Sequence, residues 1–327
     1  MNELLAGLLT LLAATNQVQA ATNFVAAKTG IVVPVAADPN DPVEKRYKQL
    51  MIEDDEAQDE VDRWIKEANE FAAKGVTTLK TTLRVRIEQR LNVVRKNYEG
   101  FLEANPKHVE GRVAFGSFLN DIGEEDAARE QYEKALGMCT NNPAIYNNLA
   151  NIYGHHGPIT NAFAFYAKAI ELNPNESVYY HNLGTSVYLF RKDAREFYQI
   201  DEQGVFDKAM ALYARALALD PTNFPLATDI AQTYYGIRPW RIEDALKAWR
   251  YALSLARDEI EREGVYIHLA RFEINAGRFD EARRNLTLVT NDMYLALKTR
   301  VSENIDRKEK EAAEKPPTAG TPGDKPK

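Results

Sequence analysis

The stretch Pro143–Pro174, PAIYNNLANIYGHHGPITNAFAFYAKAIELNP, decides the fold of this 327-residue chain. Its first half carries Tyr146, Leu149, Ala150 and Tyr153, which follow one another at offsets of three, four and seven from the first tyrosine. This spacing places all four side chains along one stripe of a helix. The first half of the stretch therefore predicts an amphipathic helix.

A second helix is predicted after the break at Gly157 and Pro158. Ala162, Tyr166 and Ala169 follow at steps of four and three, which again marks one helical face, and the next Asn-Pro pair ends it. Small residues on both helices let the two axes approach to about 8 Å, the short end of the usual range. The stretch thus predicts an antiparallel helical hairpin.

This hairpin resembles the tetratricopeptide repeat, whose signature is W-x2-L-G-x2-Y, then A-x3-F, then a closing proline. Similar spacings recur along the chain and predict five such repeats over residues 107–290. The resemblance implies an all-α fold, a right-handed superhelical solenoid in which each hairpin covers the apolar face of its neighbour and the first helices line a concave groove. The residues expected to form the repeat core are Phe115, Gly116, Tyr132, Tyr146, Leu149, Ala150, Ala162, Tyr166, Tyr180, Leu183, Gly184, Ala209, Tyr213, Ala245, Trp249, Tyr266, Leu269 and Ala282.

The regions around the repeats also have readable patterns. Residues 56–106 read as a degenerate hairpin that caps the array, with helices expected over 61–73 and 85–103. An insertion within 188–203 either lengthens a first helix or adds a helical excursion. Residues 291–313 predict a C-terminal capping helix, and the Pro/Gly-rich residues 314–327 predict a disordered tail.

The amino terminus predicts export. Leu4–Ala14 is an apolar run too short to span a bilayer, and Val18-Gln19-Ala20 resembles a signal peptidase site, so residues 1–20 are interpreted as a signal peptide. We then expect a bacterial periplasmic protein with no membrane span after cleavage. The preceding residues lack Lys or Arg, which keeps open an uncleaved helix and a cytoplasmic location.

Residues 21–55 contain three prolines and no sustained period, which predicts an extended acidic linker. Its acidic run, Glu53–Glu56, is expected at the solvated start of the next helix, where carboxylates complement the helix dipole. A role in binding a cation or a basic partner is the alternative. The run lacks the glycine-centred spacing of a calcium loop.

Composition narrows the function further. A net charge of −7 and a pI near 5.5 argue against nucleic acid as the main partner, because phosphate binding needs a basic surface. Cys139 is the only cysteine, which excludes an intramolecular disulfide and a cysteine-based zinc cage. His155 and His156 are adjacent rather than four residues apart, so they do not form a zinc-binding pair on a helix. We expect no catalytic centre, no metal and no cofactor.

The positions that face the expected groove are polar. Asn148, Asn182, Asp229 and His268 each lie two residues after the leading position of a repeat, where family members often contact the backbone of an extended peptide. Side-chain amides can satisfy a peptide backbone of any sequence. The alternative is that these asparagines cap or bridge neighbouring helices. The full candidate set is Asn147, Asn148, Asn151, His181, Asn182, Thr185, Asp229, His268 and Arg271.

Family members that grip a C-terminal carboxylate use Lys and Arg at such positions, and here only Arg271 is basic. A carboxylate-binding co-chaperone is therefore not expected. The leading hypothesis is a non-enzymatic scaffold that binds an extended peptide or a partner helix in its groove. Two alternatives stay open: a structural subunit of an envelope or secretion assembly that docks through its convex face or insertion, and an accessory domain of an enzyme system acting on polysaccharide or sulfated substrates.

Overall fold

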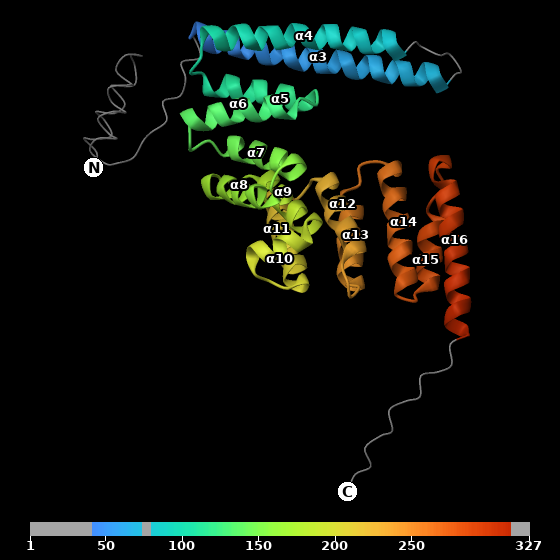
Figure 1. Ribbon diagram of the computed structural model, residues 1–327. Helices are drawn as coiled ribbons and strands as arrows, with labels where there is room; N and C mark the ends of the chain where they lie inside the picture. The colour runs from blue at the N-terminus through green and yellow to red at the C-terminus, as the bar shows by residue number, and fades with distance from the viewer. Residues whose placement is uncertain (1–40, 74–79, 315–327) are drawn as a thin grey trace, which may run out of the picture. The chain divides into compact units, whose positions relative to one another are not determined.

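The computed structural model describes residues 41–73 and 80–314, which form helices joined by turns (Figure 1). The chain divides into two compact units, Met1–Thr140 and Asn141–Lys327. Each unit is an all-α stack of helical hairpins, so the predicted fold class is confirmed. The predicted signal peptide, residues 1–20, and the tail from residue 315 lie outside the described residues.

The first unit contains two hairpins. Helix α3 (Pro42–Ala73) pairs with α4 (Lys80–Ala104), and α5 (Val109–Asp121) pairs with α6 (Glu125–Met138). The seam between α3 and α4 has a buried apolar part, over residues 50–61 of α3 and 94–98 of α4, where apolar side chains recur at helical spacing on both helices. Its buried members are Leu50, Ala57 and Val61 from α3 and Val94 and Tyr98 from α4.

The prediction of an extended linker over residues 21–55 is wrong from Pro42 onward. Helix α3 begins there, with the proline at the first position of the helix and the Asp41 side chain accepting a 2.8 Å bond from the Val43 amide. Residues 21–40 lie outside the described residues. The helix went unrecognised because its buried stripe contains Asp54, which interrupts the apolar period.

The acidic run Glu53–Glu56 consequently lies inside α3 and not at the start of a helix. Asp54 is buried, accepts a 2.8 Å hydrogen bond from the Tyr98 hydroxyl, and has a pKa raised by burial. Glu53 pairs with Arg46 at 2.7 Å. The Asp54 carboxylate therefore links α3 to α4, and the Glu53 carboxylate forms an ion pair within α3.

Hairpin α5–α6 shows why the repeats need small residues. A Cβ on Gly116 would lie 2.6 Å from the Tyr132 ring, so only glycine lets this tyrosine pack against α5. The Tyr132 hydroxyl then lies 3.1 Å from the Ser117 hydroxyl. In the turn between the two helices Gly123 has φ of +82°, a backbone conformation that glycine adopts without strain.

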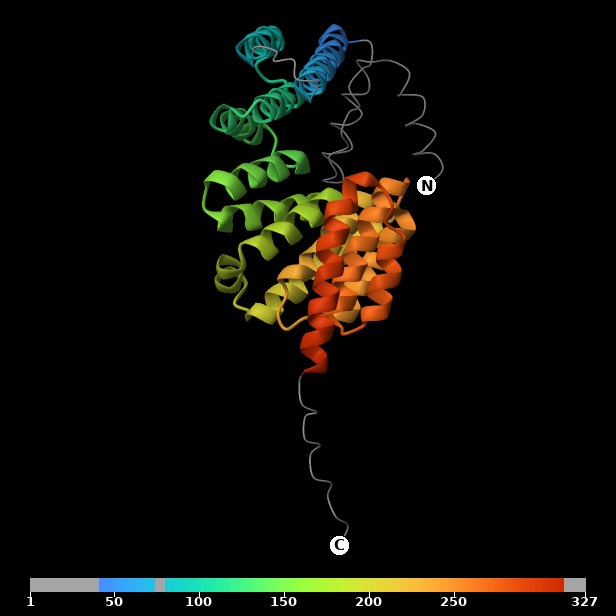
Figure 2. The same ribbon diagram turned by 90° about the vertical axis from the view of Figure 1, so that its right-hand side faces the viewer.

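The second unit contains four hairpins and a final helix (Figures 1 and 2). The hairpins pair α7 with α8, α9 with α11, α12 with α13, and α14 with α15, and α16 packs along α14 and α15. The helices are α7 (Pro143–His156), α8 (Ile159–Leu172), α9 (Ser177–Leu189), α10 (Arg191–Tyr198), α11 (Glu202–Leu219), α12 (Phe224–Thr233), the 3-10 turn η1 (Tyr234–Gly236), α13 (Ile242–Leu255), α14 (Glu259–Asn275), α15 (Phe279–Thr287) and α16 (Asp292–Ala313).

The insertion forms a separate short helix, α10, between α9 and α11. Helix α10 buries Ala194 and packs on α8, α9 and α11. Phe163 of α8 contacts both Phe197 and Tyr198, with ring centroids 5.4 and 5.6 Å apart. Of the two forms expected for the insertion, the structure has the helical excursion.

The residues expected to form the repeat core lie inside the hairpins. All of them are buried except Tyr180 and Tyr266, which are partly buried. Within the second unit three apolar clusters follow one another along the chain. A fully buried Phe, Tyr or Trp side chain contributes roughly 1.5–3 kcal/mol or more, so these clusters supply the main stabilisation of each hairpin.

Candidate functional site

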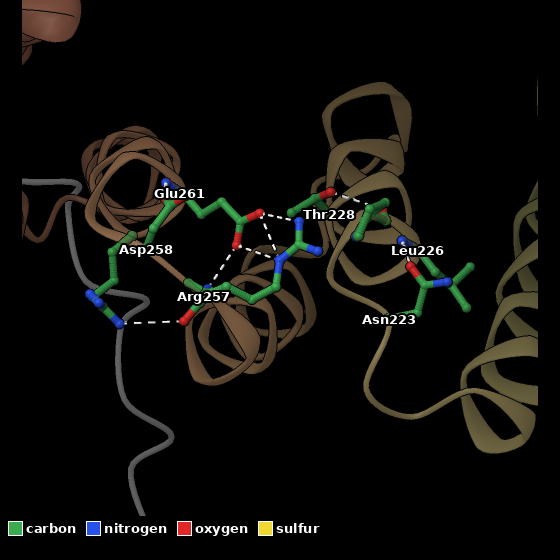
Figure 3. A network of polar contacts seen from close by, with 9 residues as sticks. Asn223, Leu226, Thr228, Arg257, Asp258 and Glu261 are labelled. Carbon is green, nitrogen blue, oxygen red and sulfur yellow. Dashed lines mark hydrogen bonds and ion pairs between the residues drawn. The ribbon is translucent and has the colours of Figure 1, made fainter. Parts of the chain in front are cut away.

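The first helices of the second unit, α7, α9, α12 and α14, each begin at a residue whose side chain caps the helix. Asn142, Glu176, Asn223 and Asp258 accept bonds from backbone amides two or three residues later. Figure 3 shows two of these caps, at Asn223 and Asp258, and the Arg257–Glu261 ion pair at the start of α14. Such caps stabilise a helix start by about 1 kcal/mol each.

Polar side chains connect these parts of the array in sequence. The contacts are Asn147–Asn182 between α7 and α9, His181–Asp229 between α9 and α12, and a link to His268 from the η1 turn that follows α12. We call this set the first-helix row. It comprises Asn147, Asn148, Asn151, His181, Asn182, Thr185, Asp229, Gln232, Tyr235, His268 and Arg271.

The asparagines of the row bond to one another. The Asn182 amide donates to Oδ1 of Asn147 at 3.0 Å and of Asn151 at 3.4 Å, and Asn147 donates to Asn148 Oδ1 at 3.2 Å. The Tyr166 hydroxyl also donates to Asn151 Oδ1, at 2.6 Å. These contacts match the alternative in which the asparagines bridge neighbouring helices, and they occupy donors that a peptide backbone would need.

The centre of the row is a small open pocket. His181 Nε2 lies 3.6 Å from Asp229 Oδ2, and the Thr185 and Tyr213 hydroxyls lie 3.0 Å apart. The pocket holds about 340 Å³. Its lining residues are His181, Thr185, Tyr188, Leu189, Tyr213, Asp229, Gln232 and Thr233.

The electrostatics of this pocket leave one exposed negative charge. Burial lowers the pKa of His181, against the opposing effect of Asp229, so the imidazole is neutral at pH 7. The Asp229 side chain is 54% exposed. A carboxylate beside a neutral ring can accept hydrogen bonds from a cation or from backbone amides of a ligand.

The far end of the row is part of the core. The His268 ring stacks on Trp249 with centroids 4.1 Å apart and planes at 2°, and it shares a 2.9 Å hydrogen bond with the Tyr235 hydroxyl. Burial and the nearby Arg271 lower the pKa of His268 to about 4. The Nδ1 atom of His268 is therefore occupied by a contact within the array, and the ring is held in place by Trp249.

Comparison with known proteins places the chain in a family. A tetratricopeptide repeat model matches residues 143–176. The photosystem I assembly protein Ycf3 of Synechococcus sp. (strain WH7803) is 31% identical over 147 residues, which cover 83% of that protein and 42% of this chain. The chain is a tetratricopeptide repeat protein.

Two further similarities extend across more of the chain. The human protein IFIT1 homolog B is 21% identical over 182 residues, which are 53% of this chain, and the chain spans only 38% of that protein. The crystal structure of PilW, described as a widely conserved type IV pilus biogenesis factor, aligns with a TM-score of 0.50 at 15% identity. That alignment covers 73% of this chain and 96% of PilW, and it shows the shared fold.

Sequence reasoning missed the tyrosine hydroxyls of this tetratricopeptide repeat protein. Each second-helix tyrosine that stands where the family has Phe bonds to a polar residue of its own first helix. The pairs are Tyr132–Ser117, Tyr166–Asn151 and Tyr213–Thr185. The Tyr-for-Phe exchange itself was the available signal, because a buried hydroxyl requires a partner.

Tetratricopeptide repeat proteins are in general scaffolds for protein interactions. Within residues 41–73 and 80–314, no group of three or more His, Cys, Asp or Glu side chains could hold a metal ion. His155 and His156 are exposed in the last turn of α7. No helix in the same part of the chain is long and apolar enough to cross a membrane.

Proposed function

We propose that this tetratricopeptide repeat scaffold holds an extended, basic segment of a partner protein along the first-helix row, with a Lys or Arg side chain of the partner at the Asp229 pocket. The observation that carries the proposal is the exposed Asp229 carboxylate at the mouth of a pocket of about 340 Å³, beside a neutral His181. A chain of net charge −7 also favours a basic partner.

The pocket differs from the amide ladder expected from the sequence. Asn147, Asn151 and Asn182 already bond within the row, so they rigidify the surface on one side of the pocket. Gln232 and Asp229 are exposed, and their polar groups can meet the main chain of an extended segment. The contact point for a ligand therefore centres on α9 and α12.

We further propose that the bound partner is a subunit awaiting assembly. This part of the proposal draws on the 31% identical Ycf3, which is named a photosystem I assembly protein. A scaffold that holds an extended segment prevents that segment from pairing elsewhere until its final partner arrives. No catalytic role is proposed.

Export is part of the same proposal. Residues 1–20 have the apolar run and the small residues of a signal peptide, and the mature chain would begin at Ala21 in a periplasm. N-terminal sequencing of the protein from its native cell tests this directly. A mature chain that begins at Met1 in the cytoplasm contradicts export and leaves the binding proposal untouched.

A second candidate is docking through the insertion. Leu189 and Phe197, at the end of α9 and in α10, are 61% and 42% exposed and offer apolar surface to a partner. In that case a Phe197→Ser variant, whose side chain does not line the Asp229 pocket, would lose its partner, and an Asp229→Asn variant would keep it. The first candidate predicts the reverse.

The binding proposal is tested with displayed random peptides selected on the full chain. One selected peptide is then titrated, by fluorescence anisotropy, against wild type, Asp229→Asn and the matched control Asp207→Asn, whose carboxylate is also exposed and pairs with Arg241. We expect Asp229→Asn to weaken binding about tenfold, the effect of a charge-assisted hydrogen bond, and the control to change it less than about twofold. Selected peptides that lack basic residues, or that bind both variants alike, would contradict the proposal.

A further inference from the structure

The first unit has an unfilled groove where two long helices outrun a short one. Helix α3 has 32 residues and α4 has 25, whereas α5, which packs against both, has 13. At about 1.5 Å per residue, α4 runs about 37 Å and α5 about 20 Å. Figure 1 shows α3 and α4 continuing past the ends of α5 and α6. Helix α5 packs in a groove between α3 and α4. Beyond the end of α5, no helix among the described residues of this unit covers that groove.

The uncovered part of this groove is concave and partly apolar. It holds about 1040 Å³ and runs between α3 and α4, closing at the α5–α6 turn. Val61 is buried in its floor, and Leu91 is partly buried there. Ile65 and Val85 line it with 40% and 44% of their surfaces exposed. Apolar side chains lining a groove that continues a helix seat are typical of a surface that receives another helix.

The polar lining of the groove is acidic. It contains four carboxylates, of Asp62, Glu88, Asp121 and Glu124, and one guanidinium, of Arg95. Arg95 pairs with Glu124, and Glu88 pairs with Arg84 on the exposed side of α4. Asp62 and Asp121 form no ion pair with any described residue. A ligand that fits this groove therefore carries positive charge beside its apolar stripe.

We infer that this groove binds an amphipathic helix of a partner protein, with an apolar stripe on Ile65 and Val85 and Lys or Arg on its flanks. The helical form follows from the groove, which continues the position of α5, and the basic flanks follow from the two lining carboxylates that have no ion-pair partner, Asp62 and Asp121. The chain's own apolar run, Leu4–Ala14, has no charged residue and lacks the cations that this lining favours. The surface lies in a different unit from the Asp229 pocket and is independent of it.

The probe is a fluorescein-labelled helical peptide with leucines on one face and lysines on both flanks. A control peptide of the same length has glutamate in place of every lysine. Both are titrated against the full chain, the groove variant Ile65→Ser/Val85→Ser, and the control variant Ile52→Ser/Val93→Ser. The control side chains are 50% and 52% exposed, lie on the same two helices, and do not line the groove. We expect the lysine peptide to bind wild type and the control variant with equal affinity, and to bind the groove variant about tenfold more weakly. We expect the glutamate peptide to bind none of the three proteins.

Several outcomes overturn the inference. Equal binding of the two peptides removes the electrostatic argument, and equal weakening by the groove and control variants removes the site. Tighter binding by Leu8→Asp/Leu9→Asp means that the chain's own amino terminus fills the groove. If wild type is a dimer and the groove variant is a monomer, measured by sedimentation, the occupant of the groove is a second copy of the chain.

One outcome supports the inference independently of the proposed function. In it, the Asp62→Asn/Asp121→Asn variant no longer binds the lysine peptide, and the Asp229→Asn variant binds it as wild type does.

Discussion

His268 makes the stability of the second unit depend on pH. Burial between Trp249 and Tyr235 lowers its pKa to about 4, whereas a histidine in the unfolded chain has an ordinary pKa of about 6.5. Between these values the unfolded state binds the proton more strongly, so the free energy of unfolding falls as the pH falls. The loss approaches about 3 kcal/mol at the low end of this window.

A His268→Phe variant keeps an aromatic ring on Trp249 and removes the titrating group. We expect it to unfold with a smaller loss of free energy between pH 6.5 and 4 than wild type, measured by urea titration at each pH. Carboxylates such as Glu263, whose pKa is lowered, add a loss of the same sign in both proteins. The exposed His155→Phe variant is the control, and a pH dependence of His268→Phe equal to wild type would refute the assignment.

Tyr213 and Thr185 form a pair whose coupling is measurable. Their hydroxyls lie 3.0 Å apart, and Tyr213 is buried, with a raised pKa caused first by burial. We expect Tyr213→Phe to lower the free energy of unfolding by about 1 kcal/mol, and Thr185→Val by a similar amount. In a double-mutant cycle the double variant should lose about 0.5–1 kcal/mol less than the sum of the single variants. Strictly additive losses would show that the two hydroxyls are not coupled.

The asparagines of the first-helix row show that the sequence predicts where a polar residue lies but not which group it bonds to. Their type and position on the first helices were predictable from the repeat spacing, but their partners were not. Asn182 bonds to side chains 35 and 31 residues earlier, in the preceding hairpin. An amide can satisfy a ligand or a neighbouring helix equally well, so only the packing of two hairpins decides between them.

At the scale of elements, one buried carboxylate fixes the turn that leads into the last helix. Glu263 of α14 is 4% exposed and accepts bonds from the Thr290 amide at 2.9 Å, the Thr290 hydroxyl at 2.9 Å and the Asn291 amide at 2.7 Å. These bonds lower the pKa of Glu263 and fix the turn that leads into α16. The carboxylate thus anchors the end of the array.

We expect Glu263→Gln to speed amide hydrogen exchange throughout α16, because a neutral amide cannot accept all three bonds as well as a carboxylate. Exchange in α7 and α8, far along the array, should not change. The matched control is Glu303→Gln, an exposed residue of α16. Unchanged exchange in α16 would show that its apolar contacts and the Arg283 ion pairs hold it without Glu263.

Element boundaries were predictable where turn residues mark them. Helix α7 begins at Pro143 and ends before Gly157-Pro158, as the sequence indicates. The start of α3 was missed because a buried Asp54 interrupts its apolar stripe, and its Tyr98 partner lies 44 residues away. The separate helix α10 was one of two expected forms, and packing on Phe163 selects it.

At the scale of the whole molecule, the tandem recurrence of the hairpin motif predicted the all-α repeat fold, because each hairpin needs a neighbour to bury its apolar face. The functional surface was less predictable. The pocket at Asp229 includes Tyr188 and Leu189, at the point where the insertion interrupts the regular repeat. The groove of the first unit depends on the unequal lengths of three helices, which the missed start of α3 had hidden.

Photo-cross-linking tests the central claim most directly. A photoreactive amino acid is placed at Gln232, which is exposed and lines the Asp229 pocket, or at Lys247, which is exposed on the second helix α13. Both proteins are irradiated with the basic peptide selected on wild type. If the peptide lies along the first-helix row, it becomes attached at position 232, unlabelled peptide competes, and position 247 stays unmodified. Attachment at 247 and not at 232 would contradict the account.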